Sequence, residues 1–352
     1  MKRLARGLRA LPLRGRPAVL VERVAGRLDR GRTPAPPPPA DELRQLAKQR
    51  FRRRVPVTQP LVLVSQIHRS GGTLLARLFD GHPALYAIPH ELGPLVPAGP
   101  VPLDARGAWE LLHDPKLEGR FHRGLRQQRR SINRDTSHTS FVLPPSVHRL
   151  IFERILESQP PAGERDVLDA YLTAYFNGWL DYHGGLDPAK RWVTGFEPGL
   201  LLSEKRVDTF RRLYPDGRLI SIVREPASWY ASARVWDERY AKVDVALDFW
   251  RRSVDAAERL ARELGERCLI LDFDALVSRT EETMGEVARF LDIELTPELL
   301  APTVNGVAFG ANSSFASEER GTVQQGSSDR ASVLTAEERD EVSRVLERLR
   351  AG

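Results

Sequence analysis

The chain has a single cysteine, Cys268, among its 352 residues, which excludes an internal disulfide and a thiolate cluster for zinc. No uninterrupted apolar run approaches the roughly 20 residues that a membrane-spanning helix needs. The first residues read MKRLARGLRALPLRGRPAVLVERVAG, and the charges scattered among them leave no apolar core of a secretory signal. Together these absences favour a reducing, cytoplasmic setting.

Composition is that of a globular protein, with 41% hydrophobic and 28% charged residues. The net charge of +6 is unevenly distributed along the chain. Residues 1–54 contain 16 Lys/Arg and 4 Asp/Glu, which leaves 37 and 43 for the remaining residues. The body is therefore mildly acidic, and this argues against nucleic acid as a partner.

Residues 1–40 form a basic segment that ends in prolines. Arginine recurs at short intervals up to residue 32, a pattern that permits an amphipathic helix on an anionic membrane but favours a solvated tail. Residues 33–40 read TPAPPPPA, which is typical of a polyproline spacer. We expect residues 1–40 to be a disordered tail and linker, with peripheral contact to the inner membrane surface as an alternative role. Residues 41–352 are expected to form a single domain.

The body alternates short apolar runs with helical patterns, which favours an α/β fold with a parallel sheet flanked by helices. The predicted strands cover residues 60–66, 84–88, 218–223 and 268–273. The predicted helices cover about 42–53, 73–82, 227–240 and 279–291. Residues 105–190 instead show helical periodicity broken by Gly and Pro, and we interpret this region as a mostly helical insertion or cap.

The most specific feature is the loop after the first strand, where residues 60–75 read PLVLVSQIHRSGGTLL. Glycines let backbone N–H groups approach an anion, and the start of a helix adds the positive end of its dipole. An arginine supplies a fixed charge and a threonine a hydroxyl. The pattern predicts a phosphate site made of Arg69, Ser70, Gly71, Gly72, Thr73 and Leu74.

The loop lacks the lysine of the nucleoside-triphosphate motif G-x-x-x-x-G-K-[ST]. When Thr73 is aligned with the final Ser/Thr, Gly72 stands at the lysine position and Gln66 at that of the first glycine. The 218–223 strand ends in Arg224 rather than in an aspartate that could bind Mg²⁺. A nucleotide or sugar kinase remains an alternative, and it predicts dependence on Mg²⁺.

A second motif follows the predicted strand 218–223. The stretch ISIVREPASWYASAR carries Arg224, Pro226 and Ser232, which bring a guanidinium and a hydroxyl to one point at the end of a strand. This motif, after a loop similar to R-S-G-T-T-L-L, resembles the sulfotransferases that use 3′-phosphoadenosine-5′-phosphosulfate (PAPS). A later stretch, LILDFDALVSRTEETMGEVARFLDIE, also resembles the end of their fold.

The resemblance implies a P-loop-like fold, PAPS as donor, 3′-phosphoadenosine-5′-phosphate (PAP) as product and no metal. The loop would hold the 5′-phosphosulfate, and Arg224 with Ser232 the 3′-phosphate. The family's late basic loop has no clean counterpart here. Arg330 and Arg320, within NSSFASEERGTVQQGSSDR, are the candidates for its role.

Sulfuryl transfer requires a base that takes the acceptor's proton. In bacterial and Golgi-type relatives an acidic residue after the second strand resembles this base. The stretch HPALYAIPHELG has Glu91 and His90 at that place, so Glu91 is the first choice and His90 the second. The acceptor carries a hydroxyl or an amine and is otherwise open: a small molecule, a glycan, a lipid, a phenol or a peptide.

A non-catalytic protein that binds polyanions or membranes through its basic tail is the alternative of another class. That interpretation leaves both phosphate motifs unexplained.

Overall fold

The computed structural model describes residues 40–91, 95–113, 141, 143–309, 320–324 and 329–351. The expected tail lies outside this part except for Ala40, at which helix α3 begins. Part of the 105–190 region and most of the late polar segment also lie outside it. Residues Ala40–Gly352 form one compact unit.

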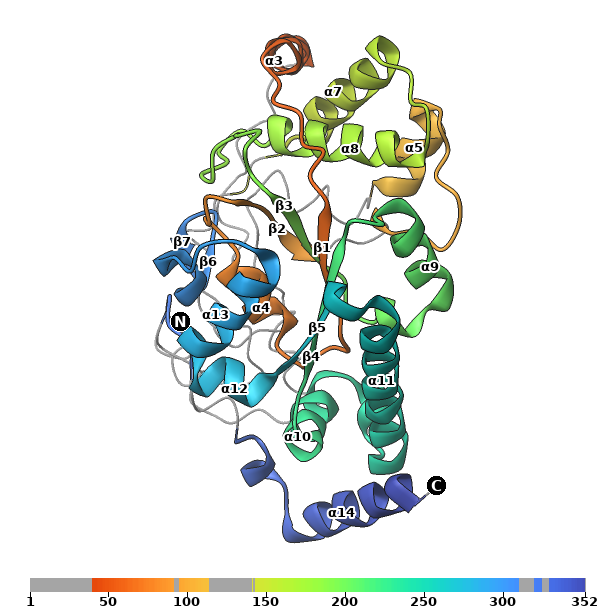
Figure 1. Cartoon of the computed structure of the whole chain (residues 1–352), viewed down its shortest axis with the longest axis vertical. Helices are drawn as coiled ribbons and strands as arrows, with labels where there is room; N and C mark the ends of the chain where they lie inside the picture. The colour runs from red at the N-terminus through yellow and green to blue at the C-terminus, as the bar shows by residue number, and fades with distance from the viewer. Residues whose placement is uncertain are drawn as a thin grey trace, which may run out of the picture. The chain divides into compact units, whose positions relative to one another are not determined.

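A five-stranded sheet forms the centre of this unit, with strand order β2-β3-β1-β4-β5 and every neighbouring pair parallel (Figure 1). Its strands are β1 (Leu61–Val64), β2 (Leu85–Glu91), β3 (Trp192–Phe196), β4 (Arg218–Val223) and β5 (Cys268–Asp272). The α/β fold with a parallel sheet is thus confirmed. The sequence-based prediction missed β3, which is only five residues long and contains a glycine, a residue that is depleted in strands.

Helices cover both faces of the sheet because alternate strand residues point to opposite sides. Leu61 and Leu63 of β1 belong to one core with residues of the helices named α3, α5, α7, α8 and α9 in Figure 1. Val62 and Val64 belong to a second core with α4, α12 and α13. A third cluster packs α10 and α11 against α14.

The bounds of the helices follow the sequence pattern closely in most places. The α-helices are α3 (Ala40–Arg52), α4 (Gly72–Leu78), α5 (Ala105–Leu112), α7 (Pro145–Ser158), α8 (Glu164–Gly178), α9 (Glu204–Leu213), α10 (Pro226–Trp236), α11 (Val243–Leu264), α12 (Phe273–Ser278), α13 (Thr280–Leu291) and α14 (Ala336–Ala351). The 3₁₀ helices are η3 (Leu200–Leu202), η4 (Glu238–Tyr240), η5 (Gly265–Arg267), η6 (Pro297–Leu300) and η8 (Ala331–Val333), and a hairpin joins β6 (Thr303–Val304) to β7 (Val307–Ala308).

The predicted 227–240 helix ends early, at Trp236. Asp237 adopts an extended backbone, and its carboxylate accepts a hydrogen bond from the Arg239 N–H, which starts a 3₁₀ turn instead. At the other end, the Glu225 carboxylate caps α10 by accepting from the N–H groups of Ala227 and Ser228. The cap fixes the start of α10 directly after β4.

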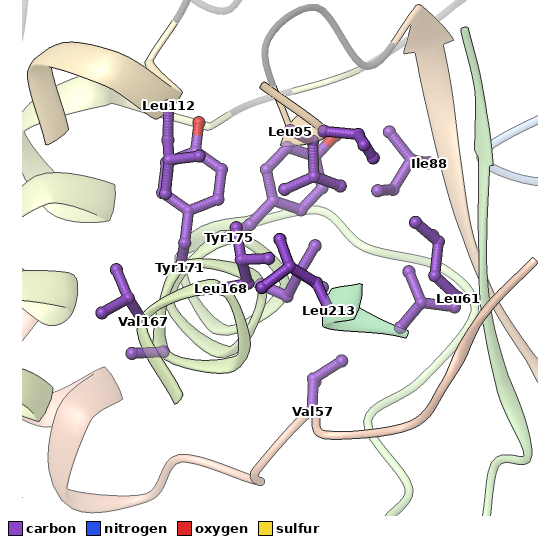
Figure 2. Packing of buried hydrophobic residues seen from close by; sticks show 14 of the residues in the cluster. Val57, Leu61, Ile88, Leu95, Leu112, Val167, Leu168, Tyr171, Tyr175 and Leu213 are labelled. Atoms are coloured by element: carbon purple, nitrogen blue, oxygen red, sulfur yellow. The ribbon is translucent and has the colours of Figure 1, made fainter. Parts of the chain in front are cut away.

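The described part of the 105–190 region is mostly helical, as expected, and its helix α8 anchors the chain that enters β1. The Thr173 hydroxyl accepts from the Val57 N–H at 2.9 Å. The Asn177 side chain accepts from the Val55 N–H and donates to its carbonyl oxygen at 2.9 and 2.8 Å. Figure 2 shows Val57 and Leu61 in the same core as Tyr171 and Tyr175 of α8.

Candidate active site

The carboxyl ends of parallel strands meet at one edge of a sheet, where ligands of open α/β folds bind. At this edge β1 leads into the loop that precedes α4, and β4 leads into Arg224. The last residue of β2 is Glu91, and β3 is followed by Glu197. The residues that the sequence analysis singled out from different strands therefore come to the same edge.

The loop before α4 has an unusual backbone. Gly71 has φ +99°, and Arg69 has φ +69°, a conformation that non-glycine residues rarely adopt. Arg69 is held on both sides, since its Nε donates to the Ser232 hydroxyl at 3.1 Å and its carbonyl oxygen accepts from Arg224 Nη1 at 3.1 Å. The two sequence motifs, 155 residues apart, are joined by these bonds.

Both glycines of the loop stand where a side chain would not fit. A Cβ on Gly71 would lie 2.4 Å from Cδ2 of Phe273. A Cβ on Gly72 would lie 1.9 Å from Nε2 of Gln66 and 2.4 Å from Cε2 of Phe196. The sequence pattern of the loop is therefore set by packing as well as by backbone conformation.

We expect Gly72→Ala to lower the free energy of unfolding by about 1–3 kcal/mol, because the added methyl overlaps buried neighbours. Gly285→Ala is the matched control, since a Cβ there meets its nearest neighbours at 3.7 Å and alanine favours the helix α13. Denaturant unfolding of both variants tests this. Equal stability of Gly72→Ala and wild type would contradict the packing described.

The other loop residues fall into two groups. Ser70 is buried, while Thr73 and Leu74 are half-buried in the first turn of α4. The Leu74 side chain packs against the core beneath α4, so only its backbone N–H can face the loop. The first N–H groups of a helix have no partner within it, which leaves those of Gly72, Thr73 and Leu74 to be satisfied from outside α4.

Three arginines converge beside this loop. Burial, and after it the charge of Arg330, lowers the pKa of Arg69 to about 10. Burial, and after it the charge of Arg69, lowers the pKa of Arg224 to about 10, and Asp274 opposes this effect. Both guanidiniums stay charged at neutral pH. Like charges brought together at low exposure are the electrostatic signature of an anion site.

Arg224 is 5% exposed and is held in place by an aromatic ring and a hydrogen bond. Its guanidinium lies over the ring of Phe273, 4.5 Å from the centroid, and its carbonyl oxygen accepts from Nε1 of Trp250 at 3.0 Å. Phe273 thus supports Arg224 and packs against Gly71. The sequence analysis did not single out Phe273, which it placed in the predicted strand 268–273; β5 ends at Asp272, and Phe273 starts α12.

The late basic residues differ in position. Arg330 is half-buried at the start of η8, and burial lowers its pKa. The N–H of the next residue, Ala331, donates to the Ser228 hydroxyl of α10 at 3.3 Å. Arg320 is exposed. Of the two, Arg330 is the one whose charge acts on Arg69 and Arg224.

At the end of β2, the half-buried residues Glu91 and His90 differ in their surroundings. The His90 ring has Nδ1 2.8 Å from the Glu91 carbonyl oxygen and Nε2 2.9 Å from the Tyr175 hydroxyl. Both nitrogens of His90 are therefore engaged in hydrogen bonds. The pairing of β2 with β3 shifts register between Ala87 and Glu91.

Glu197 is a second acidic candidate that sequence reasoning missed, because it follows the unpredicted strand β3. Its carboxylate is 12% exposed and forms an ion pair with Arg206 at 3.1 Å. Nε of Arg206 donates in turn to the Val96 carbonyl oxygen at 2.7 Å. The charge of Glu197 is thus compensated within the protein.

The sequence of residues 60–297 matches the model of the Sulfotransferase family, which spans more than half of the chain. This protein belongs to the sulfotransferase family. The interpretation of the chain as a sulfotransferase, a transferase enzyme, is confirmed. Use of PAPS as donor is the norm in that family.

Solved structures are similar to this sulfotransferase in fold. The sulfotransferase domain from the curacin biosynthetic pathway is 19% identical, with a TM-score of 0.51, and the match covers 84% of this chain and 98% of that one. The corresponding domain of the Synechococcus PCC 7002 olefin synthase is 18% identical, with a TM-score of 0.46 and coverage of 80% and 91%. No curated protein matches the chain.

Among the residues that the structure describes, no group of three or more His, Cys, Asp or Glu could hold a metal ion. Within the same ranges, no helix is long and apolar enough to cross a membrane.

Proposed function

We propose that this sulfotransferase binds PAPS at the arginine cluster beside the β1–α4 loop and transfers its sulfuryl group to a hydroxyl or amine. The observation that carries the proposal is the convergence of Arg69, Arg224 and Arg330 next to a loop whose glycines leave no room for side chains. A dianionic phosphate would relieve the repulsion among three cations.

The 3′-phosphate would lie against Arg224, Arg330 and Ser232. The Ser232 hydroxyl already accepts from Nε of Arg69, and its own O–H stays able to donate to a phosphate oxygen. The Arg69 side chain therefore belongs with this group, rather than with the 5′-phosphosulfate as its place in the loop motif suggested.

The 5′-phosphosulfate would lie against the backbone of the loop. Here the N–H groups of Gly72, Thr73 and Leu74 and the Thr73 hydroxyl are the available donors. A Cβ on either glycine would overlap packed side chains, so the loop could not keep the backbone path that offers these N–H groups. PAPS supplies an activated sulfuryl group on a phosphate leaving group, and the protein supplies position and charge.

Glu91 is the proposed base. A carbonyl oxygen only accepts, so Nδ1 of neutral His90 donates to the Glu91 carbonyl and Nε2 accepts from the Tyr175 hydroxyl. The lone pair of His90 is thus occupied, and Glu197 is paired with Arg206. Glu91 ends β2 at the same edge of the sheet, where an acidic residue would take the acceptor's proton.

A transfer assay tests the proposal. Incubation with PAPS and a panel of phenols, alcohols, sugars and amines should release PAP with at least one acceptor, at a rate that EDTA does not change. ATP with Mg²⁺ should not replace PAPS, because the loop has Gly72 where a kinase has its lysine. Consumption of ATP and Mg²⁺ with PAPS left intact would instead establish the kinase alternative.

A further inference from the structure

A buried phenol lies behind the proposed base. Tyr175 projects from α8 and is 3% exposed. Figure 2 shows Tyr175 and Tyr171 with their hydroxyls directed toward the same side of the helix. Its hydroxyl is 2.9 Å from Nε2 of His90. A side chain of the helical region thus reaches the end of the edge strand β2.

The Tyr175 hydroxyl stays protonated. Burial raises its pKa well above 10, the neighbouring hydroxyls of Tyr171 and Tyr182 act in the same direction, and the charge of Arg77 opposes them. A neutral phenol has one proton to give, and it goes to Nε2 because Nδ1 of His90 carries the other proton. The hydrogen bonds therefore run in one direction, from Tyr175 to His90 to the Glu91 carbonyl.

The backbone at Glu91 needs a restraint of this kind. The regular β2–β3 ladder pairs Leu85, Tyr86 and Ala87 with consecutive residues of β3, but the register then shifts before Glu91 pairs with Phe196. A shift of this kind leaves the strand locally unpaired and re-aims the side chain that follows. The bond from His90 to the Glu91 carbonyl fixes the peptide group at that point.

We propose that Tyr175 is a positioning residue for the sulfotransferase reaction: its hydroxyl orients His90, whose Nδ1–H holds the Glu91 carbonyl and so aims the carboxylate. The inference rests on the proposed role of Glu91. It gives α8, which lies outside both phosphate motifs, a direct part in placing the base.

Tyr175→Phe tests the inference and removes one oxygen. We expect kcat to fall about 10- to 100-fold, as is typical when a reacting group is misplaced, while KM for PAPS and the Kd for PAP stay within twofold. Tyr171→Phe is the matched control, one turn earlier on α8, and should keep kcat within twofold. Equal kcat values for the Tyr175→Phe variant and wild type would overturn the inference.

Two His90 variants distinguish positioning from proton transfer. The amide nitrogen of His90→Asn can replace Nδ1 as donor to the Glu91 carbonyl but cannot reach Tyr175. If Tyr175 acts through His90, adding Tyr175→Phe to His90→Asn should lower kcat less than twofold further. His90→Ala should be at least tenfold less active than His90→Asn, and this comparison stands even if Tyr175→Phe does not fold. Equal activity of His90→Ala and His90→Asn would overturn the inference.

The proposed function can fail separately. If Glu91→Gln keeps full turnover, Glu91 is not the base and the assignment of the reaction's base is wrong, whatever Tyr175→Phe does. If Glu91→Gln is inactive and Tyr175→Phe is fully active, the base is correct and the positioning role is refuted.

Discussion

Glu91→Gln should lower turnover roughly 100- to 10,000-fold while PAP affinity stays within a few-fold, the range expected for loss of a general base. The substitution keeps the shape of the side chain and removes its basicity. Because Glu91 ends β2 two strands away from β1, it lies on the proposed acceptor side rather than among the arginines. Single-turnover kinetics with PAPS and an acceptor from the panel would measure the loss.

Glu197→Gln is the comparison that makes this result informative. Glu197 directly follows the neighbouring strand β3, but its carboxylate is paired with Arg206 at low exposure, so its loss should lower stability before it affects chemistry. Thermal melting of both variants separates the two effects. Collapse of turnover in a stably folded Glu197→Gln variant, with Glu91→Gln active, would transfer the role of base to Glu197.

Arg224→Gln should weaken PAP binding by about 2 kcal/mol or more, or roughly 30-fold, because it removes a charge-assisted contact to the 3′-phosphate. Packing over Phe273 and a hydrogen bond to the Arg69 carbonyl oxygen orient the Arg224 guanidinium. Removal of this guanidinium should therefore change the geometry of the loop as well. Calorimetric titration with PAP measures the change directly.

Arg218→Gln is the control on the same strand. Arg218 starts β4, at the opposite edge of the sheet, and its guanidinium lies over the rings of Trp192 and Phe290 at 5.0 and 5.1 Å. The control should bind PAP as wild type does. If both variants lose affinity equally, the effect of Arg224 is one of net charge or stability rather than of contact.

The strands with long apolar runs and the loop between β1 and α4 were predictable because their signals are local. Thr73 follows β1 within nine residues, and the Arg224 motif lies within one strand–helix unit. Glu197 was missed because it follows β3. Without a predicted strand before it, nothing in the sequence indicates that this residue lies at the edge of the sheet. The sheet order that brings β2 and β3 together is a property of the folded chain alone.

Contacts between distant segments account for the rest of the site. Tyr175 and His90 are 85 residues apart, and nothing in either local pattern indicates that α8 reaches the end of β2. The direction of the Arg69 side chain was equally hidden from the local pattern, because its bond to Ser232 depends on how α10 packs beside the loop. Motif spacing predicted which residues share an edge, and packing decides which of them touch.

The central claim is that the arginine cluster recognises the 3′-phosphate of PAPS and PAP, and calorimetry with PAP beside ADP tests it most directly. The two ligands share the adenosine and carry similar charge, but ADP places both phosphates on the 5′ side. Contacts from Arg224, Arg330 and Ser232 should make PAP bind at least about 30-fold more tightly. Equal affinities for PAP and ADP would contradict the account.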